Sequence, residues 1–140
     1  MKKFSIYLAG AMSGISFEES NAWRKNITKL LNNTYADTKV KCINPNDYYN
    51  FKEVTYDSER EVMEFDLHKV RHSDLVIVNF SCPKSLGTMA ELAIAYEHRI
   101  PVIGLNEIGQ NLHPWQIEMC NKIFRNENDL VNYVIDFYLN

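Results

Sequence analysis

The 140-residue sequence has few cysteines and no long apolar run, and each absence excludes a class of protein. The three cysteines, Cys42, Cys82 and Cys120, are an odd number at long spacings, and no C-x-x-C pair occurs. This pattern argues against a disulfide framework and a structural zinc site, and it is typical of a cytoplasmic protein with reduced thiols. The apolar runs are only a few residues long, far too short to span a membrane.

The sequence also lacks a cluster of basic residues and a glycine-rich phosphate loop. Fifteen Lys and Arg side chains against 18 Asp and Glu give a formal net charge of −3. Without a basic cluster, binding to a nucleic-acid polymer is not expected. The five glycines form neither G-x-G-x-x-G nor a lysine-containing triphosphate loop, so no dinucleotide and no cofactor is expected.

No metal site is predicted either. His68 and His72 stand four residues apart in a helical pattern, a spacing that can hold zinc. No third ligand accompanies them in a recognisable pattern. A polar helix end is therefore the favoured interpretation of this pair.

The length and the 46% share of hydrophobic residues suit a single domain over residues 1–140. The first ten residues, MKKFSIYLAG, are basic and then apolar, which resembles a signal peptide. Ser5 and Tyr7 interrupt the apolar part, however. A first β-strand is therefore the favoured interpretation.

Short apolar runs alternate with helical patterns along the chain. Strands are predicted at 4–9, 40–43, 75–80 and 101–105, with a further short strand or turn within 116–124. Helices are predicted from Ser16, from Ser58, at about 88–98 and at 128–139, and loops at 48–57 and 106–116. The alternation predicts an α/β fold of the doubly wound, flavodoxin- or Rossmann-like kind, with a parallel sheet and helices on both faces.

In such a fold the carboxyl ends of the strands meet at one edge of the sheet, where ligands bind. The loops expected at this edge are 10–16, 44–57, 81–88 and 106–116. Gly10 and Gly14 lie in the first loop and Gly87 in the third. Glycine allows a backbone to approach a ligand closely, so the sequence predicts a small-molecule site there.

Glu91 has two interpretations from the residues alone. Thr88 and Glu91 have the spacing of a capping box, in which both side chains satisfy amides at a helix start. A carboxylate after Gly87 at the ligand-binding edge is also suited to chemistry. In the first turn of a helix, the helix dipole favours the charged form by up to about 1 kcal/mol. Both interpretations stay open at this point.

Three segments, IYLAGAMSG (6–14), EFDLHKVRHSDLVIVNF (64–80) and SLGTMAELAIAYEHRIPVI (85–103), follow one another in a recognisable order and spacing. Together they resemble the nucleoside 2-deoxyribosyltransferase family. The shared pattern is a Tyr-x-x-Gly strand and loop, an Asp on the helix before an apolar strand, and a Gly-x-x-x-Glu turn into a helix. The resemblance covers roughly residues 4–105.

The resemblance implies an enzyme that cleaves or exchanges the N-glycosidic bond of a 2′-deoxynucleoside or its 5′-monophosphate through a covalent glutamyl-deoxyribosyl intermediate. Glu91 aligns with the family's nucleophile and Tyr7 with the tyrosine that steers it. Asp66 aligns with an aspartate that contacts the base or helps to protonate it. The alternatives are a deoxynucleoside 5′-monophosphate N-glycosidase, which is a hydrolase, and a non-catalytic nucleotide-binding module.

The resemblance also places Gly10, Ser13, Ser85 and Gly87 along the sugar and phosphate. The family's transferases carry an aspartate six residues before the nucleophile, where this chain has Ser85. A serine at that position is similar to the branch that acts on 5′-monophosphates, because a neutral donor suits a phosphate. That branch has a second serine where this chain has Ala11, and Ser13 stands two residues later. Nucleoside and nucleotide therefore stay open.

The expected partners are a small-molecule deoxynucleoside or deoxynucleotide and a free base. The resemblance further implies a homodimer or higher homo-oligomer, in which an Asn after the last core strand completes the neighbouring pocket. Asn121 matches that residue, and the alternative is that Asn121 is a plain turn residue.

The aromatic residues Tyr48, Tyr49, Phe51 and Tyr56 either stack on a base or cover the edge of the core.

Overall fold

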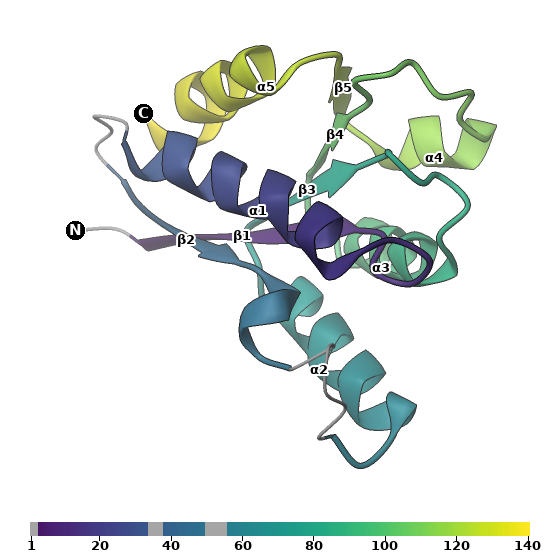
Figure 1. Ribbon diagram of the computed structural model, residues 1–140. Coiled ribbons are helices and arrows are strands. Elements are labelled where there is room, and N and C mark those ends of the chain that lie inside the picture. Colours follow the sequence, from purple (N-terminus) through teal and green to yellow (C-terminus); the bar gives the residue numbers. More distant parts are fainter. Residues whose placement is uncertain (1–2, 34–37, 50–55) are drawn as a thin grey trace.

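The computed structural model describes residues 3–33, 38–49 and 56–140, and a five-stranded sheet forms its centre (Figure 1). The strands are β1 (Lys3–Gly10), β2 (Lys39–Ile43), β3 (Leu75–Asn79), β4 (Val102–Leu105) and β5 (Lys122–Phe124). They lie in the order β2-β1-β3-β4-β5, and every neighbouring pair is parallel. The doubly wound α/β fold is therefore confirmed, and the predicted short strand before residue 124 is β5.

Helices cover both faces of the sheet (Figure 1). They are α1 (Phe17–Asn32), α2 (Glu59–Arg71), α3 (Leu86–Glu97), α4 (Pro114–Met119) and α5 (Glu127–Val134), with a 3-10 turn η1 (Pro45–Asp47) and a π-helical turn η2 (Ile135–Leu139). Because successive side chains of a strand point to opposite faces, β1 serves two cores. Ile6 and Leu8 pack with α1 and α5, whereas Tyr7 and Ala9 pack with α2 and α3.

Two of the predicted helix starts are confirmed. The Ser16 hydroxyl accepts a hydrogen bond from the Glu19 amide at 3.0 Å, and the Ser58 hydroxyl accepts one from the Glu61 amide at 3.2 Å. Each serine thus satisfies an amide that would otherwise lack a partner in the first turn.

The start of α3 differs from the prediction. The helix begins at Leu86, and the Ser85 hydroxyl caps it by accepting from the Thr88 amide at 3.4 Å. The Thr88 hydroxyl donates to Ser85 Oγ at 3.0 Å. Glu91 therefore lies in the second turn, so the capping-box interpretation of Thr88 and Glu91 and the first-turn dipole argument are wrong. Two hydroxyl residues three positions apart compete for the cap, and the first of them forms it.

Helix α4 falls at the boundary of the predicted loop 106–116. Its N-cap is His113, whose Nδ1 accepts from the Trp115 amide at 3.1 Å, while Gln116 Oε1 accepts from the His113 amide at 2.7 Å. Histidine is not among the usual N-cap residues, and the signals for this helix in the sequence were Pro114 at its first position and Gln116 at its third.

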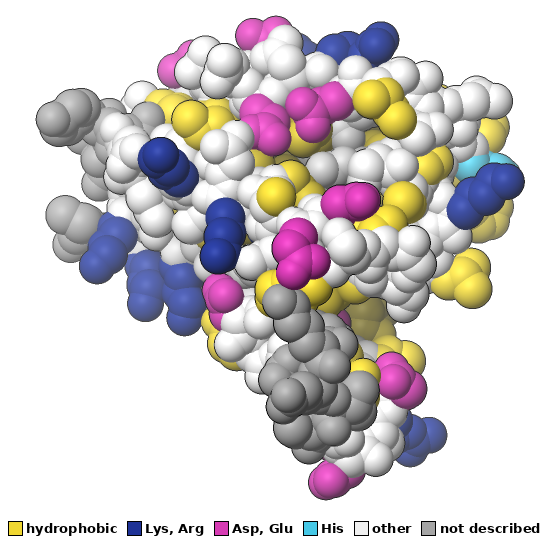
Figure 2. Space-filling view, in the orientation of Figure 1, with side chains coloured by type: hydrophobic (Ala, Val, Ile, Leu, Met, Phe, Trp, Pro, Cys, Tyr) yellow, Lys and Arg dark blue, Asp and Glu magenta, His cyan; other side chains and the backbone are white. Residues whose placement is uncertain are grey.

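The surface mixes charge types on the face that Figure 2 presents, with acidic, basic and exposed apolar side chains side by side. Within the described ranges, no helix combines the length and the apolarity that crossing a bilayer would require.

Candidate active site

Tyr7 and Glu91 meet on the face of the sheet that α2 and α3 cover. Tyr7 lies on β1 and is fully buried, and Glu91 lies on α3 with 9% of its surface exposed. The Tyr7 hydroxyl donates a short hydrogen bond to Glu91 Oε2. The carboxyl group therefore points at the end of β1 rather than back at its own helix start.

Burial dominates the titration of this pair. It raises the pKa of Glu91 to about 8, while the hydrogen bond from Tyr7 pulls that pKa down. The pKa of Tyr7 lies well above its usual value because the phenol is buried and because it faces the charge of Glu91. Tyr7 therefore remains a hydrogen-bond donor, and one oxygen of Glu91 is held in a fixed direction.

Asp66 adds a second carboxyl group from α2. Burial raises its pKa to about 6, with an opposing effect from the charge of Arg24. Its charge in turn raises the pKa of both Tyr7 and Glu91, so the three groups belong to one site. Where two carboxyl groups of one site have different pKa values, one commonly acts as the proton donor while the other acts in its ionised form.

Arg24 on α1 is a site residue that sequence reasoning missed. It is fully buried, and it donates from Nε to the Leu8 carbonyl and from Nη2 to the Gly10 carbonyl, each at 3.0 Å. Its position four residues after Ser20 and three before Ile27 places it on the inner face of the helix, beside buried neighbours. The sequence signal for Arg24 was therefore a charged residue among the buried positions of this helix.

Gly10 is required by packing at the end of β1. A Cβ atom there would lie 2.9 Å from Cζ2 of Trp23 and 3.4 Å from Nη2 of Arg24. Gly87 differs, because a Cβ there would meet no atom of the described chain within 4 Å. Gly87 is exposed in the first turn of α3, and Ser13 is exposed in the loop after β1. Both positions are open to a ligand.

A cavity of about 250 Å³ opens beside the first turn of α1 and the segment after β2. It is lined by Phe17, Asn46, Asp47, Tyr48 and Tyr49. The ring centroids of Tyr48 and Tyr49 lie 5.1 and 5.3 Å from that of Phe65, the residue before Asp66. The two tyrosines therefore pack on Phe65 of α2 and also line a cavity. Phe51 and most of the predicted loop 48–57 lie outside the described residues.

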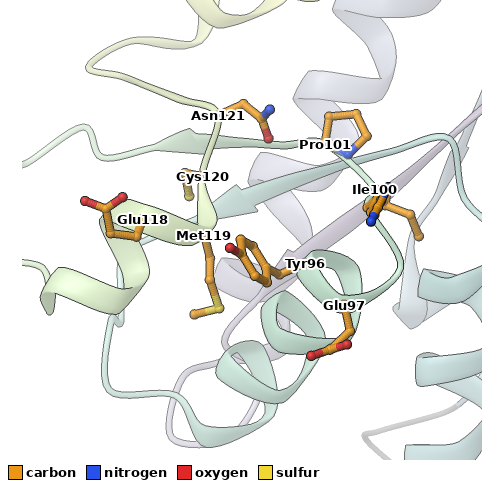
Figure 3. Close-up of a pocket in the computed structure, with 9 residues that line it drawn as sticks. Tyr96, Glu97, Ile100, Pro101, Glu118, Met119, Cys120 and Asn121 are labelled. Carbon is orange, nitrogen blue, oxygen red and sulfur yellow. The ribbon is translucent and has the colours of Figure 1, made fainter.

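A larger cavity, about 600 Å³, lies at the opposite edge of the sheet, where β4 and β5 begin (Figure 3). Asn121 lines it together with Tyr96 of α3 and Met119 of α4. The Asn121 side-chain oxygen accepts from the Val102 amide at 3.0 Å. Asn121 is thus remote from the Glu91 carboxyl group of its own chain, and a role in a neighbouring subunit stays a prediction.

The histidine pair and the cysteines offer no assembled centre. The rings of His68 and His72 lie 4.1 Å apart, and no group of three or more His, Cys, Asp or Glu side chains within 3–33, 38–49 and 56–140 is arranged to hold a metal ion. Burial raises the pKa of the Cys42 thiol to about 11 and that of Cys120 to about 12. These two thiols are therefore poor nucleophiles.

Together, the strand order and the buried Tyr7–Glu91 pair define a doubly wound α/β domain with a carboxylate site at the switch point of the sheet. Residues 3–108 match the family described as nucleoside 2-deoxyribosyltransferase like, and the chain belongs to that family. The resemblance of the three sequence segments is thereby confirmed. No curated protein matches the chain.

Several solved structures share the fold over nearly the whole chain. A conserved protein from Enterococcus faecalis V583 has a TM-score of 0.74 at 17% identity, covering 93% of this chain and 96% of its own. A 2-deoxyribosyltransferase from Bacillus psychrosaccharolyticus has 0.71 at 20% identity, covering 92% and 91%. A CMP N-glycosidase from Clostridium botulinum has 0.61 at 18% identity, covering 96% and 99%.

Proposed function

We propose that this protein cleaves the N-glycosidic bond of a 2′-deoxynucleoside or its 5′-monophosphate, with Glu91 as the nucleophile. The hydrogen bond from Tyr7 to Glu91 carries this proposal, because it orients a buried carboxyl group beside the ligand-binding edge. Family membership supports it, as do the activities named for two proteins of similar fold, a 2-deoxyribosyltransferase and a CMP N-glycosidase.

In the first step, an oxygen of Glu91 attacks C1′ of the deoxyribose while the bond from C1′ to the base nitrogen breaks. The electron pair of that bond leaves with the base, and the sugar becomes an ester of Glu91. Tyr7 holds Oε2, which leaves Oε1 for the attack. In the second step, a free base or water attacks C1′ and releases Glu91.

Asp66 donates the proton that the departing base needs. The productive form of the pair has Glu91 ionised and Asp66 protonated, so the pair carries one proton. With pKa values of about 6 for Asp66 and about 8 for Glu91, the singly protonated pair predominates between those two pH values, with its proton mostly on Glu91. The productive form is the minor arrangement of that pair, in which the proton has moved to Asp66, and its share is greatest over the same pH range. A bell-shaped profile of kcat/KM with its optimum near neutrality follows.

The surrounding residues supply the rest of the pocket. The base lies against the aromatic cavity of Phe17, Tyr48 and Tyr49, since bases stack on aromatic rings. Gly10, Ser13 and Gly87 line the sugar and the 5′ side. A homodimer or higher oligomer brings Asn121 of one subunit to the pocket of another.

Light scattering tests the predicted oligomer. A monomer at the concentration used for the activity assay would contradict it.

Base release is the experiment that tests the proposed function. Each deoxynucleoside and each 5′-monophosphate is incubated with the protein, with and without a free acceptor base. Exchange that depends on the acceptor identifies a transferase, and release into water alone identifies an N-glycosidase. Binding without release or exchange from any substrate contradicts catalysis and leaves a nucleotide-binding module.

Ser85→Asp tests what the start of α3 holds. We expect kcat/KM for the 5′-monophosphate to fall by about 100-fold with little change for the nucleoside, because a carboxylate repels a phosphate. Aspartate caps a helix as well as serine does, so α3 is retained. Ser85→Asn is the matched control, since it caps the helix without charge. Equal losses for nucleoside and monophosphate would refute a phosphate contact at residue 85.

A further inference from the structure

Arg24 is a buried cation that the proposed chemistry does not use directly. Its side chain is fully buried in α1, and all three of its nitrogen atoms donate to main-chain carbonyl oxygens, those of Leu8, Gly10 and Ser20. The guanidinium also lies over the ring of Trp23, 4.8 Å from its centroid. Because it is covered on all sides, Arg24 cannot touch a substrate.

The register of the sheet explains why Arg24 is there. Strand β2 pairs with β1 only as far as Tyr7↔Ile43, whereas β3 follows β1 to Gly10↔Asn79. The last residues of β1 therefore have no strand on the β2 side, and two of their carbonyl groups need other donors. Arg24 supplies these donors at Leu8 and Gly10, at 3.0 Å each. Arg24 thereby donates the hydrogen bonds that a longer β2 would otherwise donate to the end of β1.

The same guanidinium interacts electrostatically with the three groups of the site. Tyr7 comes from β1, Asp66 from α2 and Glu91 from α3, and each interacts electrostatically with Arg24. Burial lowers the pKa of Arg24, and these three neighbours oppose that shift. In return, the positive charge lowers the pKa of both Glu91 and Asp66. Ionised carboxyl groups in a buried site need such a counter-charge.

We propose that Arg24 is a positioning residue of this site. It holds the end of β1 so that Tyr7 meets Glu91, and it supplies a buried positive charge that acts electrostatically on both carboxyl groups. The proposal rests on the proposed function for its effect on rate, but its electrostatic part can be measured without any substrate.

The experiment compares Arg24→Met, which removes the charge, with Arg24→Lys, which keeps the charge and loses the planar fork. For Arg24→Met we expect both limbs of the kcat/KM profile to move to higher pH by about one unit. For Arg24→Lys we expect the limbs near their original pH and a kcat about tenfold lower, because the strand end is held less firmly. Lys25→Met, which removes the exposed neighbouring cation, is the control and should leave both limbs in place.

A substrate-free titration separates this proposal from the proposed function. Carboxyl carbon NMR of the labelled protein, with Glu91→Gln for assignment, follows the Glu91 signal against pH. A midpoint that rises in Arg24→Met supports the proposal even if no nucleoside is cleaved. An unchanged midpoint overturns it even if the wild-type protein is active. If Arg24→Met does not fold, the test uses Arg24→Lys instead. A wild-type kcat in Arg24→Lys overturns the positioning role.

Discussion

Glu91→Gln lowers kcat/KM for base release by on the order of 10⁴-fold while the protein stays folded. The amide cannot form the glycosyl ester, so the double displacement loses its first step. Its oxygen still accepts the hydrogen bond from Tyr7, and the side chain keeps its volume in the buried site. The measurement is steady-state base release beside chemical unfolding of both proteins.

The stability of Glu91→Gln distinguishes a catalytic carboxylate from a structural one. The folded state raises the pKa of Glu91 from 4.5 to about 8, so it holds the proton more tightly than the unfolded chain. The free energy of unfolding therefore falls as pH rises from about 4.5 to about 8 in the wild type, and this contribution is absent in the amide. We expect Glu91→Gln to be at least as stable as the wild type at pH near 8.

Glu97→Gln is the matched control for this experiment, because Glu97 is exposed at the last residue of the same helix. It should change neither rate nor stability. If Glu91→Gln unfolds easily and yet retains its rate per folded molecule, Glu91 serves the structure and another residue attacks the sugar.

Asp66→Asn lowers kcat by about 10²- to 10³-fold and changes the shape of the pH profile. The amide has no acidic proton for the leaving nitrogen, so the fall in rate at high pH disappears. One titration then remains, that of Glu91, and the rate rises with pH to a plateau. Because the charge of Asp66 raises the pKa of Glu91, that rise should lie somewhat below pH 8.

Nucleosides with different bases sharpen the test of Asp66. A base that leaves easily needs less protonation, so its loss of rate in Asp66→Asn should be smaller than that of a poor leaving base. Glu64→Gln, an exposed carboxylate on the same helix α2, is the control. An equal loss for every base, together with an unchanged pH profile, would show that Asp66 does not act as the acid.

The sequence predicted the helices and strands well where neighbouring residues determine them, through helix caps and apolar runs. Ser16 and Ser58 cap α1 and α2 as expected, and the apolar runs form the central strands. Local chemistry was ambiguous at α3, where Ser85 and Thr88 both suit a cap. It was weaker at α4, where Pro114 suits a helix start but His113 is an unusual N-cap residue.

The site could be predicted only in part. The resemblance named Tyr7, Asp66 and Glu91, and the structure brings these three side chains into one electrostatic cluster. Arg24 could not be found in this way, because its role depends on β2 ending opposite Tyr7 while β1 runs on to Gly10. The buried stripe of α1 marks Arg24 as unusual, but strand register is a long-range property, so the role of Arg24 could not be read from that local pattern.

Capture of the glycosyl-enzyme tests the central claim most directly. A 2-fluoro deoxynucleoside analogue forms the ester but hydrolyses slowly, because fluorine destabilises the positive charge that develops at C1′. After incubation and digestion, mass spectrometry should find one sugar per chain on the peptide that contains Glu91, with one equivalent of base released. Release of base with the sugar on another residue, or with no sugar attached to the protein, would contradict the proposed role of Glu91.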